Sequence, residues 1–519
     1  MTAQAFDHVY QALLALVDYA QDRGLIGAED RAYAANQLLD ALRLEADDSF
    51  DPLERAFAEG EVPPLEGVLA ALLDDAVARG VIDGGIASRD LLDTRLMGCV
   101  TPRPSEVVRG FWERYEEAPK EATDWFYQLA LSSDYIRSYR VARDRKWKAA
   151  TSYGELDITI NLSKPEKDPK AIAAALTKRQ DAYPRCLLCP QNTGYAGRLD
   201  HPARQTIRLI PLTLASEPWF LQYSPYVYYN EHCIVLSEEH RPMRIERKTF
   251  VRLLEFVTTF PHYTVGSNAD LPIVGGSILT HEHYQGGRYE FAMARASVRE
   301  EVSFPGFEDV QAGVVEWPMS VIRLDCDDPA RLVELADRIL SAWRGYSDAA
   351  VGVLAETEGA PHNTITPIAR RRGTAYELDL VLRNNRTSDR HPLGIFHPHA
   401  DLHHVKKENI GLIEVMGLFI LPGRLLSELE GLKDYLTGRR AVDDAPGADS
   451  PLDKHYEWVR DIAARRGVGM SDDEADAALR QELAVKCARV LADAGVYKQT
   501  EEGDRGIVRF LSSLGYKTV

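Results

Sequence analysis

The chain has 519 residues, 45% of them hydrophobic and 27% charged, and its formal net charge at pH 7 is −18. This length supports roughly two to four domains, and the acidic balance argues against general nucleic-acid binding, which requires a basic surface. No segment approaches the roughly 18 apolar residues of a membrane span, no signal peptide is recognisable, and the six cysteines suggest no disulfide framework. The sequence therefore predicts a soluble, cytoplasmic protein.

Residues 1–150 are predicted to form a helical N-terminal domain, because apolar residues recur there at three- and four-residue spacing. The predicted helices cover residues 9–20, 28–44, 65–81, 105–115 and 123–142. Ser105 is the expected N-cap of the fourth helix, since it follows a proline-rich break. No catalytic grouping of polar residues occurs in this region, which favours a role in packing or dimerisation.

Residues 151–300 are predicted to form an αβ domain. Residues 156–162 alternate at period two, as in a strand with one solvated face, and the apolar, β-branched residues 271–280 predict a buried strand. The other strands are expected at residues 206–214, 219–222 and 232–237. Helices are expected at residues 171–180 and 250–260.

Residues 301–440 repeat this plan more loosely, as a second αβ domain. A strand at 314–324, a helix at 329–345 and a strand at 376–383 precede a His-x-His pair, His397 and His399. Because a His-x-His pair also ends the first αβ segment, the two segments suggest a duplicated domain. Residues 441–519 are predicted to be mostly helical. The expected fold class is α+β with mainly antiparallel sheet.

The stretch from His281 to Gly287, with the sequence His-Glu-His-Tyr-Gln-Gly-Gly, carries the strongest catalytic pattern. In an extended chain His281, His283 and Gln285 share one face, while Glu282 and Tyr284 face the other way. A neutral imidazole can attack phosphorus, a glutamine amide can donate to a phosphoryl oxygen, and glycines permit a sharp turn or a close approach to a ligand. The alternative is a strand end with incidental histidines. Walker A, G-x-G-x-x-G and G-x-S-x-G motifs are absent from the sequence, which leaves a histidine nucleophile as the better option.

Cys186 and Cys189 form a C-x₂-C pair, which indicates metal binding or redox chemistry. The flanking prolines do not favour a thioredoxin-like redox site. The sequence contains no second C-x₂-C pair, so a metal site would need histidines from elsewhere. The candidate histidines are His201, His232, His240 and His281. Two partly buried thiols without a metal are the alternative.

Taken together, these motifs and several others resemble the galactose-1-phosphate uridylyltransferases, over nearly the whole chain. The helical N-terminal extension is similar to the second, bacterial class of the family. The resemblance implies histidine-triad-like αβ domains. The matching motifs are Cys186-x-x-Cys189, Asn192, His201-Pro-Ala-Arg204, Tyr229-Asn-Glu-His-Cys233, Ser237-Glu-Glu-His240, Ser267-Asn-Ala-Asp-Leu-Pro272, the His281–Gly287 stretch, His397-Pro-His-Ala-Asp401 and the run from Lys406 to Gly417.

The resemblance implies roles for particular residues. His283 matches the nucleophile that accepts the uridylyl group, and Gln285 matches the residue that hydrogen-bonds the transferred phosphoryl group. A structural zinc ion is implied at Cys186, Cys189, His240 and His281. Glu282 departs from the better-known class, which has proline at this position, and the link from Ser277 to His281 is one residue longer.

The resemblance also implies residues around the substrate. Asn268 and Ser277 match positions near the phosphates and the sugar, and Asn192 and Arg198 fall beside the nucleotide. Lys407 aligns with a substrate-side lysine, and Glu414, after a one-residue slip, aligns with a hexose-binding glutamate. A second metal site is implied at His362, His397 and His399, for which the sequence offers no matching carboxylate ligand.

The implied activity is exchange of UMP between UDP-glucose and galactose 1-phosphate through a uridylyl-histidine intermediate. The products are UDP-galactose and glucose 1-phosphate, as required in galactose metabolism, and the family leads us to expect a homodimer. The first alternative is a related nucleotidyltransferase that uses UTP or N-acetylhexosamine 1-phosphates. The second is a non-enzymatic, zinc-stabilised binding protein in which both His281 and His283 are structural.

Overall fold

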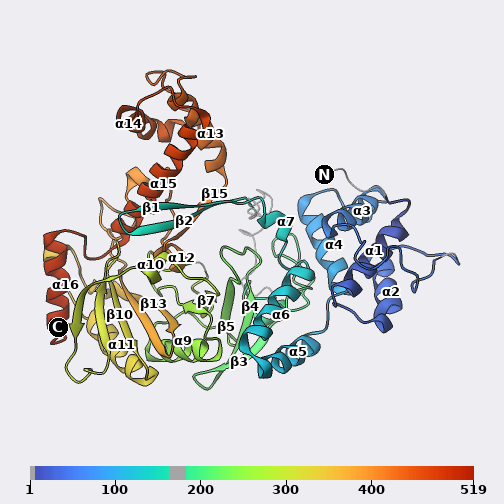
Figure 1. Cartoon of the computed structure of the whole chain (residues 1–519), viewed down its shortest axis with the longest axis horizontal. Coiled ribbons are helices and arrows are strands. Elements are labelled where there is room, and N and C mark those ends of the chain that lie inside the picture. The colour runs from blue at the N-terminus through green and yellow to red at the C-terminus, as the bar shows by residue number, and fades with distance from the viewer. Residues whose placement is uncertain (1–5, 49, 163–182, 277, 519) are drawn as a thin grey trace.

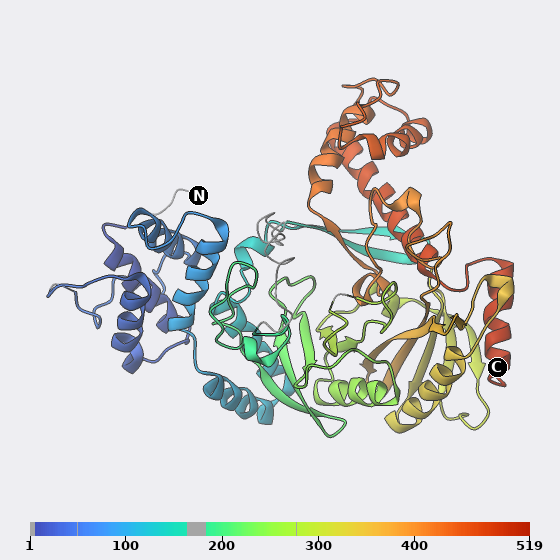
Figure 2. The ribbon, with the colours of Figure 1, turned by 180° about the vertical axis from the view of Figure 1, so that it is seen from behind.

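The computed structural model describes residues 6–48, 50–162, 183–276 and 278–518. A lobe of helices at the N-terminus lies beside a large central sheet, and an arm of C-terminal helices projects from the opposite half of the molecule (Figure 1). The view from behind shows the same three parts (Figure 2). The α+β class and the helical N-terminal region are confirmed. No helix in the described ranges has the length and apolarity needed to cross a bilayer.

The N-terminal lobe and the helices that join it to the sheet follow most of the predicted periodicity. Their bounds are α1 (Val9–Asp22), α2 (Arg31–Leu42), α3 (Leu65–Ala78), α4 (Ile86–Cys99), α5 (Pro104–Glu117), α6 (Pro119–Ser132) and α7 (Ser138–Val141). The prediction of Ser105 as N-cap was wrong: Arg103 is the N-cap of α5, and Pro104 occupies the first helical position, where its missing N–H costs nothing. Helix α4 was not predicted.

The single helix predicted over residues 123–142 is wrong. Helix α6 ends at Ser132, and Asp134 adopts a left-handed backbone conformation with φ of 54°. Arg137 then pairs with Asp90 at 2.6 Å and with Asp93 at 3.1 Å, which fixes the connection against helix α4. A tertiary ion-pair cluster therefore overrides the local helical pattern.

The central sheet has eleven strands in the order β16-β8-β9-β10-β14-β13-β6-β7-β5-β4-β3, and every pair in it is antiparallel. This confirms the prediction of mainly antiparallel sheet. The first half holds β3 (Ile210–Leu214), β4 (Glu217–Tyr223), β5 (Cys233–Ser237), β6 (Thr264–Gly266) and β7 (His283–Gly287). The second half holds β8 (Val298–Ser303), β9 (Gln311–Val315), β10 (Val321–Cys326), β13 (Asn363–Arg372) and β14 (Ala375–Asn384), and β16 (Lys517–Thr518) adds an edge.

The two halves of the sheet share one topology, as a duplicated αβ unit requires. In each half three strands are followed by a helix and then by two strands, and the last strand inserts beside the third. The helices are α9 (Arg247–Thr259) and α11 (Pro329–Arg344). The halves meet where β6 pairs with β13, so the two αβ units form one continuous sheet. The single strand predicted at 314–324 was wrong, because this segment contains the end of β9, a turn and the start of β10, which pair antiparallel.

The two faces of this sheet carry different residues. Helices α9 and α11 pack together and against β13, and one core cluster contains their apolar residues together with Val235 and Tyr284. Alternation along β7 turns His283 and Gln285 away from that layer. The face that carries the predicted catalytic residues is therefore the one that these two helices leave open.

The described part of residues 271–280, which leaves out residue 277, contains no strand, contrary to the prediction. This segment turns back on itself, with one isolated bridge between Ala269 and Gly275, and the strand begins only at His283. Side chains satisfy part of its backbone: Asn385 accepts from Ile273 N at 2.7 Å, and Asn409 donates to Pro272 O at 2.7 Å. Proline and paired glycines favour turns over ladders, and here they outweigh the apolar β-branched composition.

A second, three-stranded sheet joins the C-terminal arm to the rest of the chain. Its strands are β1 (Arg145–Thr151), β2 (Gly154–Asn161) and β15 (Leu418–Pro422). The prediction that residues 156–162 have one solvated face was wrong, because β2 lies between two strands and its residues from Leu156 to Asn161 are buried. The helix predicted at 171–180 lies outside the described residues.

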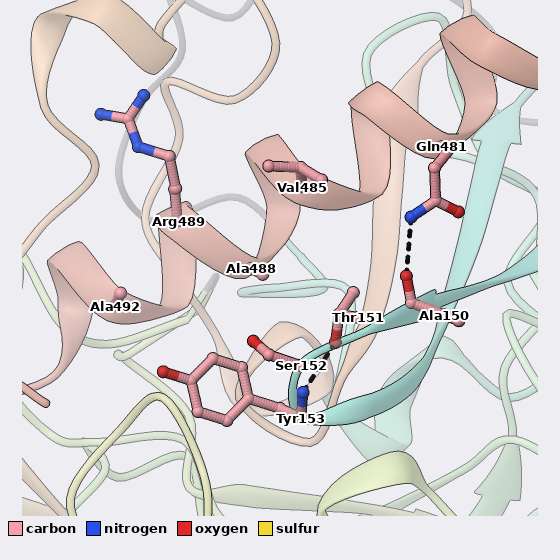
Figure 3. A pocket seen from close by; sticks show the side chains of 9 residues that line it. All are labelled: Ala150, Thr151, Ser152, Tyr153, Gln481, Val485, Ala488, Arg489 and Ala492. Atoms are coloured by element: carbon pink, nitrogen blue, oxygen red, sulfur yellow. Dashed lines mark hydrogen bonds between the residues drawn. The ribbon is translucent and has the colours of Figure 1, made fainter.

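The C-terminal region is helical, as predicted. It contains α13 (Arg424–Thr437), α14 (Tyr456–Arg466), α15 (Asp472–Ala494) and α16 (Glu501–Ser513). Helix α15 packs against the β1–β2 turn and leaves a surface pocket there (Figure 3). Arg489, the charged residue of its lining, pairs with Asp401 at 2.7 Å. None of the residues that line this pocket belongs to the predicted site.

Candidate active site and metal centre

Two cysteines and two histidines converge at one end of the sheet. Cys186 Sγ lies 3.6 Å from Cys189 Sγ and 3.3 Å from His281 Nδ1, and Cys189 Sγ lies 3.2 Å from His240 Nδ1. All four donor atoms lie within 4.8 Å of one another. Among the four candidate histidines, the structure thus selects His240 and His281. The four residues form a group that can hold a metal ion.

Strand pairing explains why these residues meet. His240 follows the end of β5 and His281 precedes the start of β7, and these two strands pair antiparallel, so both histidines lie at the same edge. The Nε2–H of His281 donates to Ser237 O at 2.8 Å, which leaves Nδ1 free as a ligand atom. The hydrogen bond from Cys186 Sγ lowers the pKa of Cys189, which favours the thiolate form that a metal ion binds.

Asn192 closes the cysteine loop. Its Nδ2 donates to Cys186 O and to Cys189 O, each at 2.8 Å, and its Oδ1 lies 2.7 Å from His201 Nε2. Asn192 is 1% exposed. His201 therefore lies outside the group of potential ligands and supports the loop that carries its two cysteines, a role that residue spacing alone did not reveal.

His283 begins strand β7 and is buried. Its Nδ1 lies 2.8 Å from His281 O, and because a carbonyl only accepts, Nδ1 carries the proton and Nε2 carries the lone pair. Burial, the largest influence, lowers the pKa of His283 to about 4. The imidazole is thus neutral at physiological pH, as a nucleophile must be.

Gln285 stands two residues beyond His283 on the same face of β7. Its Oε1 lies 3.1 Å from Nε2 of His232, a buried histidine just before β5. The glycine pair after Gln285 has a structural role within the sheet. A Cβ on Gly286 would lie 2.6 Å from Thr264 O, so this glycine allows β6 to approach β7.

Glu282 faces the opposite side of β7, as predicted, and its carboxylate is held by two arginines. Arg241 Nε lies 2.6 Å from Oε2, Arg252 lies 2.8 Å from Oε1, and the Tyr284 hydroxyl donates to Oε1 at 3.1 Å. The backbone of Glu282 is also fixed, since its N–H donates to Arg241 O at 2.7 Å and its carbonyl accepts from Ser237 N at 3.1 Å. The residue between His281 and His283 is thus anchored through both backbone and side chain.

Replacing Glu282 with glutamine is expected to lower the free energy of unfolding by about 2–3 kcal/mol, because the buried Arg252 then keeps only Glu217 as a counter-charge. Chemical denaturation measures this loss. Glu239 is the matched control, since its exposed carboxylate lies 3.7 Å from the same Arg241. Glu239→Gln should cost less than about 1 kcal/mol. Equal effects of the two variants would contradict the anchoring role of Glu282.

The loop after β6 and the loop before β15 meet beside Gln285. Gly266, at the end of β6, pairs with Gln285, and two residues later Asn268 Oδ1 accepts from Leu412 N at 2.8 Å. Glu414 lies in the same short helix as Leu412 and pairs with Lys406 at 2.9 Å. A polar carboxylate–ammonium pair therefore borders the open face of the sheet.

Comparison with known proteins gives matches along most of the chain. The models of the N-terminal and C-terminal domains of galactose-1-phosphate uridyl transferase match residues 68–242 and 255–458. Curated galactose-1-phosphate uridylyltransferases of Caldanaerobacter subterraneus subsp. tengcongensis and Clostridium acetobutylicum are each 50% identical to this chain, over 97% of both chains for the first and over 96% of this chain and 98% of the relative for the second. The Bacillus subtilis protein of the same name is 48% identical over 98% of this chain and 99% of its own length.

The chain belongs to the galactose-1-phosphate uridylyltransferase family. It is accordingly an enzyme of the transferase class, and the resemblance inferred from its motifs is confirmed. Among solved structures, yeast Ap4A phosphorylase covers 62% of this chain at 12% identity with a TM-score of 0.29, a likeness too weak to support any comparison of the folds.

Within this family member the structure places several predicted substrate residues differently. The side-chain amide of Asn192 is bonded to the carbonyls of Cys186 and Cys189 and to His201. Arg198 pairs with Asp200 at 2.5 Å and donates to Tyr183 O and to the Tyr195 hydroxyl, each at 2.7 Å. Both residues therefore stabilise the loop that carries the two cysteines, while Arg198 Nη2 has no hydrogen-bond partner among the described residues. Ser277 lies outside the described residues.

Lys407 is the residue that the sequence predicted on the substrate side. Its side chain is exposed, whereas the preceding Lys406 is buried and paired with Glu414. Burial opposes the charge on Lys406, but Glu414 and Glu408 raise its pKa above the ordinary value, so the ammonium is retained. The polar pair at this edge of the site is thus Lys406 and Glu414.

The three histidines of the second predicted metal site do not share a centre. Within the described ranges, the group of Cys186, Cys189, His240 and His281 is the one set of three or more potential ligands that converges. His362 Nε2 bonds Thr357 Oγ1 at 2.9 Å, His397 Nδ1 bonds Pro398 O at 3.2 Å, and His399 Nε2 bonds Ile395 O at 3.2 Å.

Proposed function

We propose that this enzyme transfers UMP from UDP-glucose to galactose 1-phosphate in two steps. His283 Nε2 attacks the α-phosphorus of UDP-glucose, the bond to glucose 1-phosphate breaks, and a uridylyl-histidine forms. A phosphate oxygen of galactose 1-phosphate then attacks the same phosphorus, releasing UDP-galactose and freeing Nε2. The observation that carries this proposal is the hydrogen bond from His283 Nδ1 to His281 O, since it places the lone pair on Nε2 of a neutral, buried imidazole.

The charge on the reacting phosphoryl group requires nearby donors. Gln285 occupies the next position on the same face of β7 and can donate its amide to a non-bridging oxygen. Asn268 and Glu414 lie beside it, and we assign them and Lys406 to the substrate edge of the site. Lys407 is a weaker candidate because its side chain is exposed. Asn192 and Arg198 hold the loop that carries the two cysteines, and their place beside the nucleotide stays a prediction.

We assign zinc to Cys186, Cys189, His240 and His281. With Zn–S of about 2.3 Å and Zn–N of about 2.1 Å, a tetrahedral ion separates its ligand atoms by roughly 3.4–3.8 Å. Four of the six separations here run from 3.2 to 3.8 Å, and all six lie within 4.8 Å. A Cys₂His₂ set of this kind is closed, so zinc would supply structural cross-linking rather than catalysis. Because His281 lies two residues before His283, the ion would fix the start of the strand that carries the nucleophile. We do not propose the second metal site.

We keep the four regions predicted from the sequence, residues 1–150, 151–300, 301–440 and 441–519, as part of this proposal. The two αβ units, 151–300 and 301–440, would form the reaction site. A cytoplasmic location and a homodimeric state stay predictions that rest on resemblance to the family. Light scattering of the purified protein would establish its oligomeric state.

A substrate panel tests the proposal against the related nucleotidyltransferase. We expect transfer from UDP-glucose to galactose 1-phosphate, with glucose 1-phosphate released in equal amount, and slower reaction with UTP or N-acetylhexosamine 1-phosphates. Phosphorus NMR follows the two substrates and the two products in one tube. Preference for UTP with pyrophosphate release would establish the alternative, and binding of UDP-glucose without turnover would indicate the non-enzymatic protein.

A further inference from the structure

His232 is a buried histidine that the proposed reaction does not yet use. Cys233 pairs with Gly286 and Ile234 with Gln285, so His232 continues this register by one residue and lies diagonal to Gln285 across the two strands. Its side chain shares the face of Gln285 and His283. It was a candidate metal ligand from the sequence, but it does not belong to the metal cluster.

The hydrogen bonding of His232 fixes its tautomer. Nε2 lies 3.1 Å from Gln285 Oε1, while Nδ1 is buried without a hydrogen-bond partner in the described part of the chain. A buried N–H without an acceptor is costly, so the proton belongs on Nε2, where it is donated to the glutamine oxygen. With Oε1 taken in this way, the side-chain amide of Gln285 offers only its NH₂ group elsewhere.

Aromatic rings hold the imidazole in place. Tyr228 stacks on it with ring centroids 5.4 Å apart, and Tyr229 contacts it at 4.5 Å. The Tyr229 hydroxyl donates to Gly286 O at 3.2 Å, which ties the same group to the residue after Gln285. Burial lowers the pKa of His232 to about 4, so its ring is a neutral donor throughout the physiological range.

Resting on the proposed function, we infer that His232 is a positioning residue that orients the Gln285 amide. A phosphoryl oxygen only accepts hydrogen bonds, so Gln285 assists transfer only when its NH₂ group faces the phosphorus. An amide that is free to rotate would present its carbonyl oxygen part of the time and repel the same anion. His232 removes that orientation by engaging the carbonyl oxygen from behind.

A double-mutant cycle on the full-length protein tests this inference. The variants are His232→Phe, which keeps the ring between the tyrosines but lacks the donor, Gln285→Ala, and their combination. Each variant is mixed with UDP-glucose, and the rate of uridylylation is measured in a single turnover as the rate at which glucose 1-phosphate is released. We expect His232→Phe to lower this rate about tenfold and Gln285→Ala about a hundredfold, with the combination no slower than Gln285→Ala within about twofold.

A residue that only supports packing would give a different result. Independent losses in the two single variants, with the double variant about tenfold slower than Gln285→Ala, would overturn the inference, as would an unchanged rate in His232→Phe. His232→Gln supplies a donor of another shape and should recover the rate to within about threefold of the wild type. If His232→Phe does not fold, His232→Gln replaces it in a cycle with Gln285→Ala. A tenfold loss of rate in folded His232→Gln, with additive effects in that cycle, would overturn the inference.

Failure of the inference is distinct from failure of the proposed function. If UDP-glucose labels the wild-type protein at His283 but the cycle is additive, only the role of His232 falls. If the wild-type protein is not labelled and releases no glucose 1-phosphate, the proposed function falls, and the role of His232 with it.

Discussion

Replacing His283 with alanine is expected to reduce uridylyl transfer on the order of 10⁴-fold or more, because the variant has no group that can form the covalent intermediate. Wild-type protein incubated with UDP-glucose labelled in the uridine should retain the label after denaturation, and the variant should not. The hydrogen bond of the buried imidazole goes to the backbone carbonyl of His281 and to no charged side chain, so the fold should persist. Intact-mass spectrometry gives the measurement directly.

The matched control for this variant is His8→Ala. His8 is an exposed histidine that caps helix α1 by accepting from Gln11 N at 3.1 Å, in the N-terminal lobe. The His8→Ala variant should retain the same amount of uridine label as the wild type. Retention of label by the His283→Ala variant, at the same stoichiometry as the wild type, would show that another residue is the nucleophile.

Replacing Cys186 with serine is expected to abolish zinc binding and to lower the thermal midpoint by roughly 10 °C or more, since structural zinc contributes on the order of 10 kcal/mol to folding in small domains. Its Sγ lies 3.3 Å from His281 Nδ1, so the loss also loosens the strand that carries His283. Transfer activity should therefore fall although no group that touches substrate has changed. Elemental analysis of the wild type should give one zinc ion per chain.

Cys326→Ser is the control for the loss of a buried sulfur. Cys326 is a free, buried thiol on β10 that takes no part in the metal cluster. This variant should keep one zinc ion per chain. A wild-type protein that contains no metal and keeps its stability in a strong chelator would rule out the zinc assignment.

The sequence alone determined the local chemistry of the site. The period-two alternation of His-x-His-x-Gln placed His283 and Gln285 on one face of a strand and Glu282 and Tyr284 on the other, and the structure bears this out because side-chain direction in a strand depends only on the neighbouring residues. The C-x₂-C spacing likewise indicated a metal site, since it brings two sulfurs together within one turn of chain.

The tertiary structure decided everything that depends on residues far apart. Cys186 and His281 are 95 positions apart, and only the pairing of β5 with β7 selects His240 and His281 over His201 and His232 as the histidines of the metal cluster. The same pairing shows that Glu282 is an anchor between two arginines and that His232 lies against Gln285. Local periodicity carries no information about strand register, which is fixed by the burial of the whole sheet. The sequence therefore identified the candidate reacting groups, and the fold determined what holds them in place.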